Sequence, residues 1–212
     1  FRNIGIPTSG FMDQESAWAA NELVDNNKDE SLLEITLTGP TLIFNCNCVI
    51  SITGGDFNPL INNLPVKMYQ SINVRTGDIL KLNNTINGAR SYIAISGGLN
   101  VKSLFGSKSF FSNISDSYHL KKGDEIKVSK KSESQILKWD KLKFNLNRFM
   151  KVFRGPEYDL LSTNSKQKLF KNEFTINSNN RMAYNLEEKL QVDIKTIISS
   201  PVLPGSVQLT PS

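Results

Sequence analysis

The chain has 212 residues, of which 39% are apolar and 21% charged, and its formal net charge is +5 at pH 7. This apolar content excludes an intrinsically disordered chain, because it can bury enough surface to offset the entropy of ordering, and the length suits one large domain or two small ones. No apolar run approaches the ~20 residues of a membrane-spanning helix, and the N-terminus lacks the pattern of a secretion signal, so we expect a cytoplasmic protein without a membrane partner.

The stretch from Gly5 to Phe44 combines several unusual local features. A loop punctuated by glycines leads to Asp13, whose carboxylate can cap a predicted helix at Gln14–Val24. Asn21 interrupts the alanine-rich face of that helix, so it either satisfies nearby backbone groups or points into a site. Loops that hold polar groups on a rigid scaffold commonly carry function, which makes this stretch the first candidate for a site.

An alternating strand is predicted next, at Leu32–Thr38. Leu33, Ile35 and Leu37 share one face of this strand, and Glu34 lies on the other. Because Glu34 has apolar and threonine neighbours on its own face, we expect its carboxylate to be partly buried.

Further strands follow one another with short turns and no helices between them. We predict strands at Thr41–Phe44, Cys48–Ile52, Pro59–Ile61, Pro65–Tyr69, Ile79–Leu82 and Ala89–Ser96. Strands spaced so closely are typical of an antiparallel barrel or sandwich. Arg90 and Tyr92 share one face of the last predicted strand.

A second β unit is predicted to begin near Met150, because Gly155-Pro156 follows a predicted strand there as Gly39-Pro40 follows an earlier one. We therefore divide the chain into a first β unit at 1–128, a charged connector at 129–149 and a second β unit at 150–212. The second unit has few residues for a core of its own. We expect it to be incomplete at its C-terminus, either cut short or completed by a partner.

Much of the positive charge lies between Lys121 and Lys151. Such a stripe can bind nucleic acid through phosphate contacts, or it can be a solvated, lysine-rich linker. Aromatic residues do not interleave with the lysines in a stacking pattern. We therefore favour the linker and expect no nucleic-acid partner.

Familiar catalytic motifs are absent from the sequence. It has no Gly-x-Ser-x-Gly elbow, and its single histidine, His119, has no evident serine or cysteine partner. Cys46 and Cys48, which we expect to be free thiols, do not make a metal site with one distant histidine. Without a P-loop or a dinucleotide fingerprint, the chain has no cofactor motif of its own.

The remaining candidates are polar residues spread over both predicted units: Asp13, Asn21, Glu34, Arg90, Tyr92, Arg181 and Gln208. Arginines suit a carboxylate or a developing oxyanion, which they can bind with two parallel hydrogen bonds. Periodicity alone leaves open whether each of these residues is catalytic or structural.

Short motifs of the chain also carry a resemblance to a known family. They run in order over nearly the whole sequence and include Gly5-x-Pro7-x-Ser9-Gly10-x-Met12-Asp13, Leu32-Leu33-Glu34, Gly88-x-Arg90-x-Tyr92, Gly106-Ser107-x-Ser109, Arg181-Met182 and Pro204-Gly205-x-Val207-Gln208. By these motifs the chain resembles the family called allophanate hydrolase subunit 2, KipA, biotin-dependent carboxyltransferase or the 5-oxoprolinase C-subunit.

The resemblance implies a mainly β fold of two cyclophilin-like β-barrel units with a few short helices. It also implies a non-autonomous subunit of a bacterial, ATP-dependent 5-oxoprolinase, which opens 5-oxoproline to glutamate with a KipI-like and a LamB/YcsF-like subunit. ATP would act through that complex, and biotin stays a possible cofactor that the sequence does not support. The substrate would be a small amide or carboxylate.

The same resemblance implies a site without metal, in which four residues are catalytic and three bind substrate: Asp13, Glu34, Arg90 and Arg181, and then Asn21, Tyr92 and Gln208. The two arginines would orient a carboxylate or stabilise an amide-derived oxyanion, and Asp13 or Glu34 would hold an amide N–H or act as a base.

Three positions depart from the family's pattern. Lys108, Ala183 and Asn185 stand where arginine, glycine and arginine are usual, and lysine lacks the planar fork of arginine. A loss or narrowing of activity is therefore an open alternative. Two other functions also stay open: a regulatory protein that binds a KipI-like partner, and a carboxyltransferase component of a urea- or allophanate-type biotin-dependent system.

Overall fold

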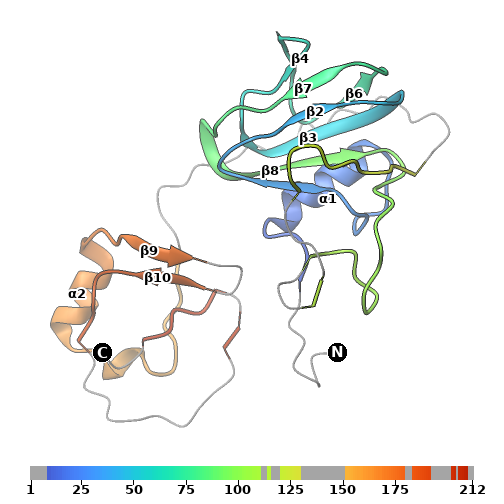
Figure 1. Ribbon diagram of the computed structural model, residues 1–212. Helices are drawn as coiled ribbons and strands as arrows, with labels where there is room; N and C mark the ends of the chain where they lie inside the picture. Colours follow the sequence, from blue (N-terminus) through green and yellow to red (C-terminus); the bar gives the residue numbers. More distant parts are fainter. Residues whose placement is uncertain are drawn as a thin grey trace. The chain divides into compact units, whose positions relative to one another are not determined.

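A computed structural model describes residues 9–110, 114–115, 120–129, 151–179, 183–191, 202–203 and 205–209. The chain divides into two compact units, Phe1–Phe144 and Asn145–Ser212, and each is considered by itself (Figure 1). Strands outnumber helices in the described residues, and every strand pair is antiparallel. The mainly β fold is therefore confirmed, whereas the predicted connector at 129–149 stays a prediction.

The first unit contains one helix and eight strands among its described residues. In chain order they are α1 (Gln14–Leu23), β1 (Leu33–Thr36), β2 (Thr41–Ile43), β3 (Cys48–Asp56), β4 (Leu60–Ile61), β5 (Leu64–Pro65), β6 (Ser71–Val74), β7 (Ile79–Lys81) and β8 (Asn87–Ile95).

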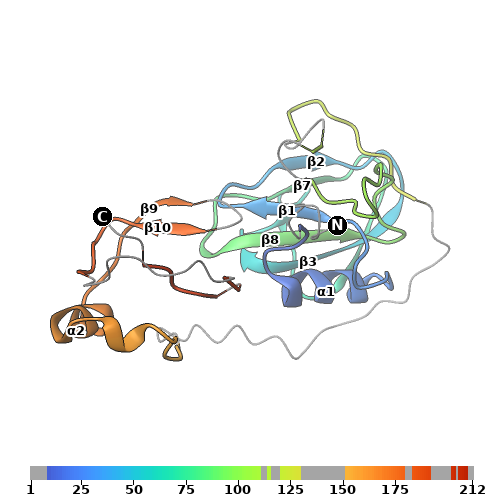
Figure 2. The same ribbon diagram turned by 90° about the horizontal axis from the view of Figure 1, so that it is seen from below.

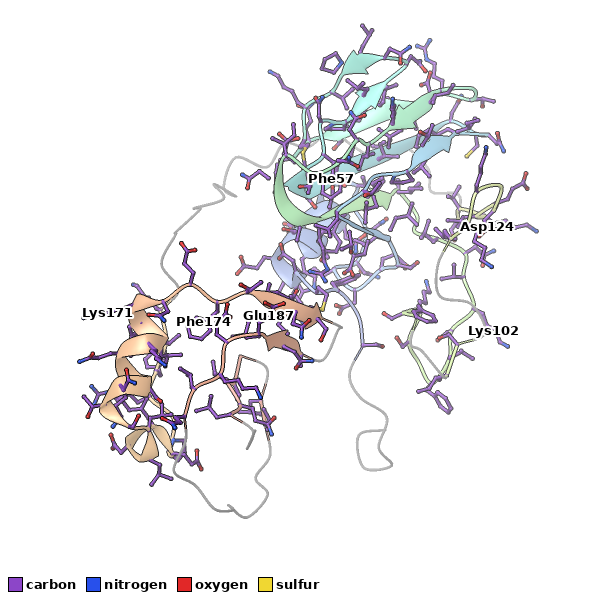
Figure 3. All side chains as sticks on the ribbon, turned by 60° about the vertical axis from the view of Figure 1, so that its left-hand side comes forward. Phe57, Lys102, Asp124, Lys171, Phe174 and Glu187 are labelled. Atoms are coloured by element: carbon purple, nitrogen blue, oxygen red, sulfur yellow. The ribbon has the colours of Figure 1, made fainter. Side chains whose placement is uncertain are left out.

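These strands form two four-stranded antiparallel sheets, ordered β1-β8-β3-β6 and β2-β7-β4-β5. The core contains residues of both sheets, including Ile50, Ile52, Leu80 and Ile93, all of them fully buried. Figure 3 shows Phe57, also fully buried, within this unit. The alternation read from the sequence is explained by this packing, because each strand turns one face toward the core.

Helix α1 covers the face of the β1-β8-β3-β6 sheet that points away from this core (Figure 2). Its alanines allow close approach to Tyr92 and Ala94 on β8. Hydroxyl groups on the sheet also donate to carbonyl oxygens along the helix, from Thr53 to Ser16 at 2.7 Å, from Ser51 to Ala20 at 2.6 Å and from Ser71 to Leu23 at 2.6 Å. This row of hydrogen bonds sets the position of α1 along its axis.

Two of the predicted strands differ from the structure for a backbone reason. The strand predicted at Leu32–Thr38 ends at Thr36, because Leu37 has a φ of 61°. The strand predicted at Pro65–Tyr69 is wrong beyond Pro65, and Tyr69 has a φ of 59°. A residue other than glycine that has a positive φ leaves the extended region of the backbone, and here that interrupts the strand. The next strand, β6, was not predicted.

The second unit contains, among its described residues, a 3₁₀ helix at Tyr158–Leu160, α2 (Thr163–Lys171), β9 (Ile176–Asn179) and β10 (Tyr184–Leu186). Ser162 caps α2, and the Ser165 hydroxyl donates to the carbonyl oxygen of Gln191 at 2.7 Å. In the part of the chain that the structure describes, no helix has the length and apolar character needed to cross a bilayer. Both cysteines are free thiols, as predicted.

Candidate functional site

The candidate site is built on the pairing of β1 with β8. Their register places Glu34 opposite Tyr92 and Thr36 opposite Arg90. Since side chains two residues apart share a face of a strand, Glu34, Tyr92 and Arg90 lie on the same side of the sheet, where α1 begins. The structure thus brings together three residues that the sequence left on two separate predicted strands.

The Tyr92 hydroxyl joins this sheet to the loop before α1. It accepts a hydrogen bond from the backbone N–H of Asp13 at 2.8 Å and donates one to Glu34 Oε2 at 3.1 Å. The backbone N–H of Met12 donates to the same carboxylate oxygen at 2.9 Å. Glu34 and Tyr92 therefore hold the end of the loop in one conformation.

Burial raises the pKa of Tyr92, the Asp13 N–H opposes that shift, and the charge of Glu34 adds to it. The hydroxyl therefore stays protonated at any physiological pH. Tyr92 can act in this site as a neutral hydrogen-bond donor, and it does not supply a phenolate base.

Arg90 places a cation at the edge of this cluster. Its Nε lies 3.8 Å from Glu34 Oε1, and the two side chains are 19% and 18% exposed. An arginine in such a position can present the rest of its guanidinium to an incoming carboxylate or oxyanion, with the geometry of two parallel hydrogen bonds. The Arg90 side chain is thus held by Glu34 and remains partly accessible to solvent.

Asp13 is the N-cap of α1, as the sequence predicts. Its Oδ1 accepts from the backbone N–H of Ser16 at 3.1 Å, and its Oδ2 accepts from the Ser16 hydroxyl at 2.5 Å. Both carboxylate oxygens are therefore engaged at the start of the helix. A base role for Asp13 would require its release from Ser16.

The cap leads to a prediction for Asp13→Ala. We expect this change to lower the free energy of unfolding by about 1 kcal/mol, because the first turn of α1 loses its side-chain acceptor. Chemical denaturation of the full chain measures the loss. Asp13→Asn is the matched control, since asparagine caps helices about as well as aspartate; an equal loss in both variants would contradict capping as the cause.

Asn21 lies away from this cluster. It is two helical turns beyond Asp13, about 12 Å along the axis of α1, and it is fully buried. Its Nδ2 donates to the carbonyl oxygens of Lys28 and Glu30 at 3.0 and 2.9 Å. Of the two roles that the sequence left open for Asn21, the contacts in the structure are those of backbone satisfaction.

The other predicted site residues fall in the second unit. Arg181 lies outside the described residues, and Gln208 is exposed. Asn185 donates from Nδ2 to the Ser178 hydroxyl at 2.9 Å. Within the described ranges, no group of three or more His, Cys, Asp or Glu side chains could hold a metal ion.

Lys108, the departure in the first unit, forms a salt bridge with Glu30 at 2.5 Å. Its neighbour Ser107 lies 3.5 Å from Ser9, measured between the two hydroxyl oxygens. The loop before α1 is therefore contacted by the Gly106-Ser107 motif as well as by Glu34 and Tyr92.

Two contributors were missed by sequence reasoning. Ser16 follows the cap residue by three positions, a spacing that indicates a capping partner. Tyr69 reaches Gly54, beside the Arg90 backbone. For Tyr69 the sequence carried no usable signal, because the contact joins residues on different strands and loops.

The sequence of this chain is similar to a known protein family and to several known proteins. The sequence profile of the family described as carboxyltransferase domain, subdomains A and B, matches residues 4–212. The 5-oxoprolinase C-subunit of Escherichia coli is 26% identical over 216 residues, which cover 99% of this chain and 70% of that protein. The urea amidolyase of Saccharomyces cerevisiae is 37% identical over 108 residues, which cover 51% of this chain but only 6% of the yeast protein.

Solved structures show the same similarity. The crystal structure of TTHA0988 superimposes with a TM-score of 0.76 at 26% identity, covering 96% of this chain and 41% of that one. The crystal structure of the K. lactis urea amidolyase gives a TM-score of 0.69 at 29% identity, covering 86% of this chain and 12% of that one.

Proposed function

Because the chain belongs to the family of carboxyltransferase domains, subdomains A and B, we propose that it is a non-autonomous subunit of an ATP-dependent 5-oxoprolinase. One observation carries the proposal. The similarity to the 5-oxoprolinase C-subunit extends along 99% of this chain, whereas the sequence similarity to yeast urea amidolyase extends along 51% of it. Nearly the whole of this chain therefore aligns with the 5-oxoprolinase C-subunit.

The proposed reaction adds water across the lactam C–N bond of 5-oxoproline and yields glutamate, with ATP hydrolysis as the driving step. The chain has no nucleotide-binding motif, so ATP would be handled by partner subunits. We propose a KipI-like and a LamB/YcsF-like protein as these partners, in the cytoplasm. A shared site among three chains would explain why the sequence shows no hydrolytic-triad motif.

The contacts in the first unit favour particular roles. 5-Oxoproline carries one carboxylate, and Arg90 is suited to bind it or to stabilise the oxyanion of the opening amide. Glu34 holds Arg90 with one oxygen and the Met12 N–H with the other. In this proposal Arg90 contacts substrate, while Glu34 orients Arg90, holds the amide N–H or acts as a base.

A urea-type carboxyltransferase is the second candidate function. The higher identity to urea amidolyase, 37% over 108 residues, favours it. Such an activity would need carboxybiotin carried on another protein. The two candidates differ in the substrate group that Arg90 would meet, because urea has no carboxylate.

Reconstitution tests the proposal. The purified chain is mixed with a KipI-like protein, a LamB/YcsF-like protein, ATP and 5-oxoproline, and glutamate is measured. We expect glutamate only when all three proteins are present. Turnover at the same rate without this chain would refute the proposed role. A parallel reaction with urea, bicarbonate, ATP, a biotin carboxylase and a biotin-carrying protein tests the second candidate.

A further inference from the structure

Tyr69 has an unusual backbone for a bulky residue. Its φ of 59° lies in the left-handed region, which aromatic side chains rarely adopt. The backbone is held there by a hydrogen bond from the Tyr69 N–H to the carbonyl oxygen of Ile52 at 2.9 Å. Residues kept in such conformations by their surroundings cluster near functional sites, so the contacts of this side chain are informative.

The Tyr69 hydroxyl binds both backbone groups of one residue. It accepts from the N–H of Gly54 and donates to the carbonyl oxygen of Gly54, each at 2.9 Å. Gly54 lies where the β3–β8 register shifts, and it has a φ of 85°. A methyl group at Gly54 would lie 2.5 Å from the carbonyl oxygen of Arg90. The Tyr69 hydroxyl thus holds the backbone that packs directly against Arg90.

The same hydroxyl lies close to the start of α1. Burial raises the pKa of Tyr69 to about 12, the Gly54 hydrogen bond opposes this shift, and the charge of Asp13 adds to it. The hydroxyl is therefore protonated at neutral pH and able to keep its donor bond to Gly54. Tyr69 lies in the segment before β6 and contacts Gly54 of β3, whereas Tyr92 belongs to β8.

We infer that Tyr69 is a positioning residue for Arg90, acting through Gly54 and the irregular pairing of β3 with β8. It does not touch substrate. It fixes the position of the Arg90 backbone, so that the guanidinium can contact both Glu34 and an incoming carboxylate. Its effect on kinetics rests on the proposed function, whereas its effect on the placement of Arg90 does not.

The first test needs no substrate. In the full chain, the Nε–H resonance of Arg90 is identified by its loss in Arg90→Lys. We expect Tyr69→Phe to change the chemical shift of this resonance by more than it changes the chemical shift of any other arginine Nε–H signal. Thr41→Val, which removes an exposed hydroxyl from β2 in the other sheet of the same unit, should leave it in place. An unshifted Arg90 resonance, or a Tyr69→Phe chain that does not fold, would overturn the inference.

The second test uses the reconstituted complex. Tyr69→Phe should raise KM for 5-oxoproline about 10- to 100-fold, with a smaller effect on kcat. In an Arg90→Ala background the same change should alter KM less than about twofold, because two residues that act through one group are not additive. Additive effects would overturn the inference. Absence of turnover in the wild-type complex would refute the proposed function instead and leave the resonance test to decide on Tyr69.

Discussion

Arg90→Ala is expected to lower kcat/KM of the reconstituted complex for 5-oxoproline by about 10²- to 10³-fold. The cation lies 3.8 Å from Glu34 and is 19% exposed, so it is held in place and still accessible. Its removal takes away the group that would bind the substrate carboxylate or the developing oxyanion. Steady-state glutamate formation, with KM and kcat determined separately, measures the effect.

The controls for Arg90 separate charge from geometry. Arg90→Lys keeps the charge but loses the planar fork, and it should recover only part of the activity. Arg75→Ala removes an exposed arginine from a turn of the same unit, and it should leave kcat/KM unchanged. If Arg90→Ala is as active as Arg75→Ala, Arg90 has no part in the site. If Arg90→Ala lowers kcat/KM by the same factor with a urea-type substrate, Arg90 does not act by binding the substrate carboxylate.

Asn21→Ala is expected to cost about 2–5 kcal/mol of the free energy of unfolding. The fully buried amide donates to two backbone carbonyls, of Lys28 and Glu30, and accepts from Asn26 Nδ2 at 3.3 Å. Each buried group left without its partner costs about 1–3 kcal/mol. Chemical denaturation monitored by circular dichroism gives the value.

Asn27→Ala is the matched control for Asn21, because Asn27 is exposed and lies in the loop that Asn21 holds. We expect its effect to be within about 0.5 kcal/mol. A similar small effect for Asn21→Ala would contradict the structural role. In that case, a loss of substrate affinity with unchanged stability would support the substrate-binding role of Asn21 that the family resemblance implies.

Predictability from the sequence differed between local and distant features. The cap at Asp13 and most of α1 were predictable, because an N-cap hydrogen bond joins residues only three positions apart. The common face of Arg90 and Tyr92 followed from strand alternation. The end of the Pro65–Tyr69 prediction failed, because positive φ at Tyr69 depends on contacts with Ile52 and Gly54 that no local pattern encodes.

The sequence by itself determined the mainly β class, the start of the helix and the polar residues worth testing. Local hydrogen bonds and the periodicity of side chains are properties of short segments, so they can be read along the chain. The tertiary structure alone decided which of those residues meet. The pairing of β1 with β8 places Glu34 opposite Tyr92, and the packing of α1 brings the Asp13 N–H to the Tyr92 hydroxyl. That register depends on burial across the whole unit, because only one alignment buries the apolar faces of all its strands.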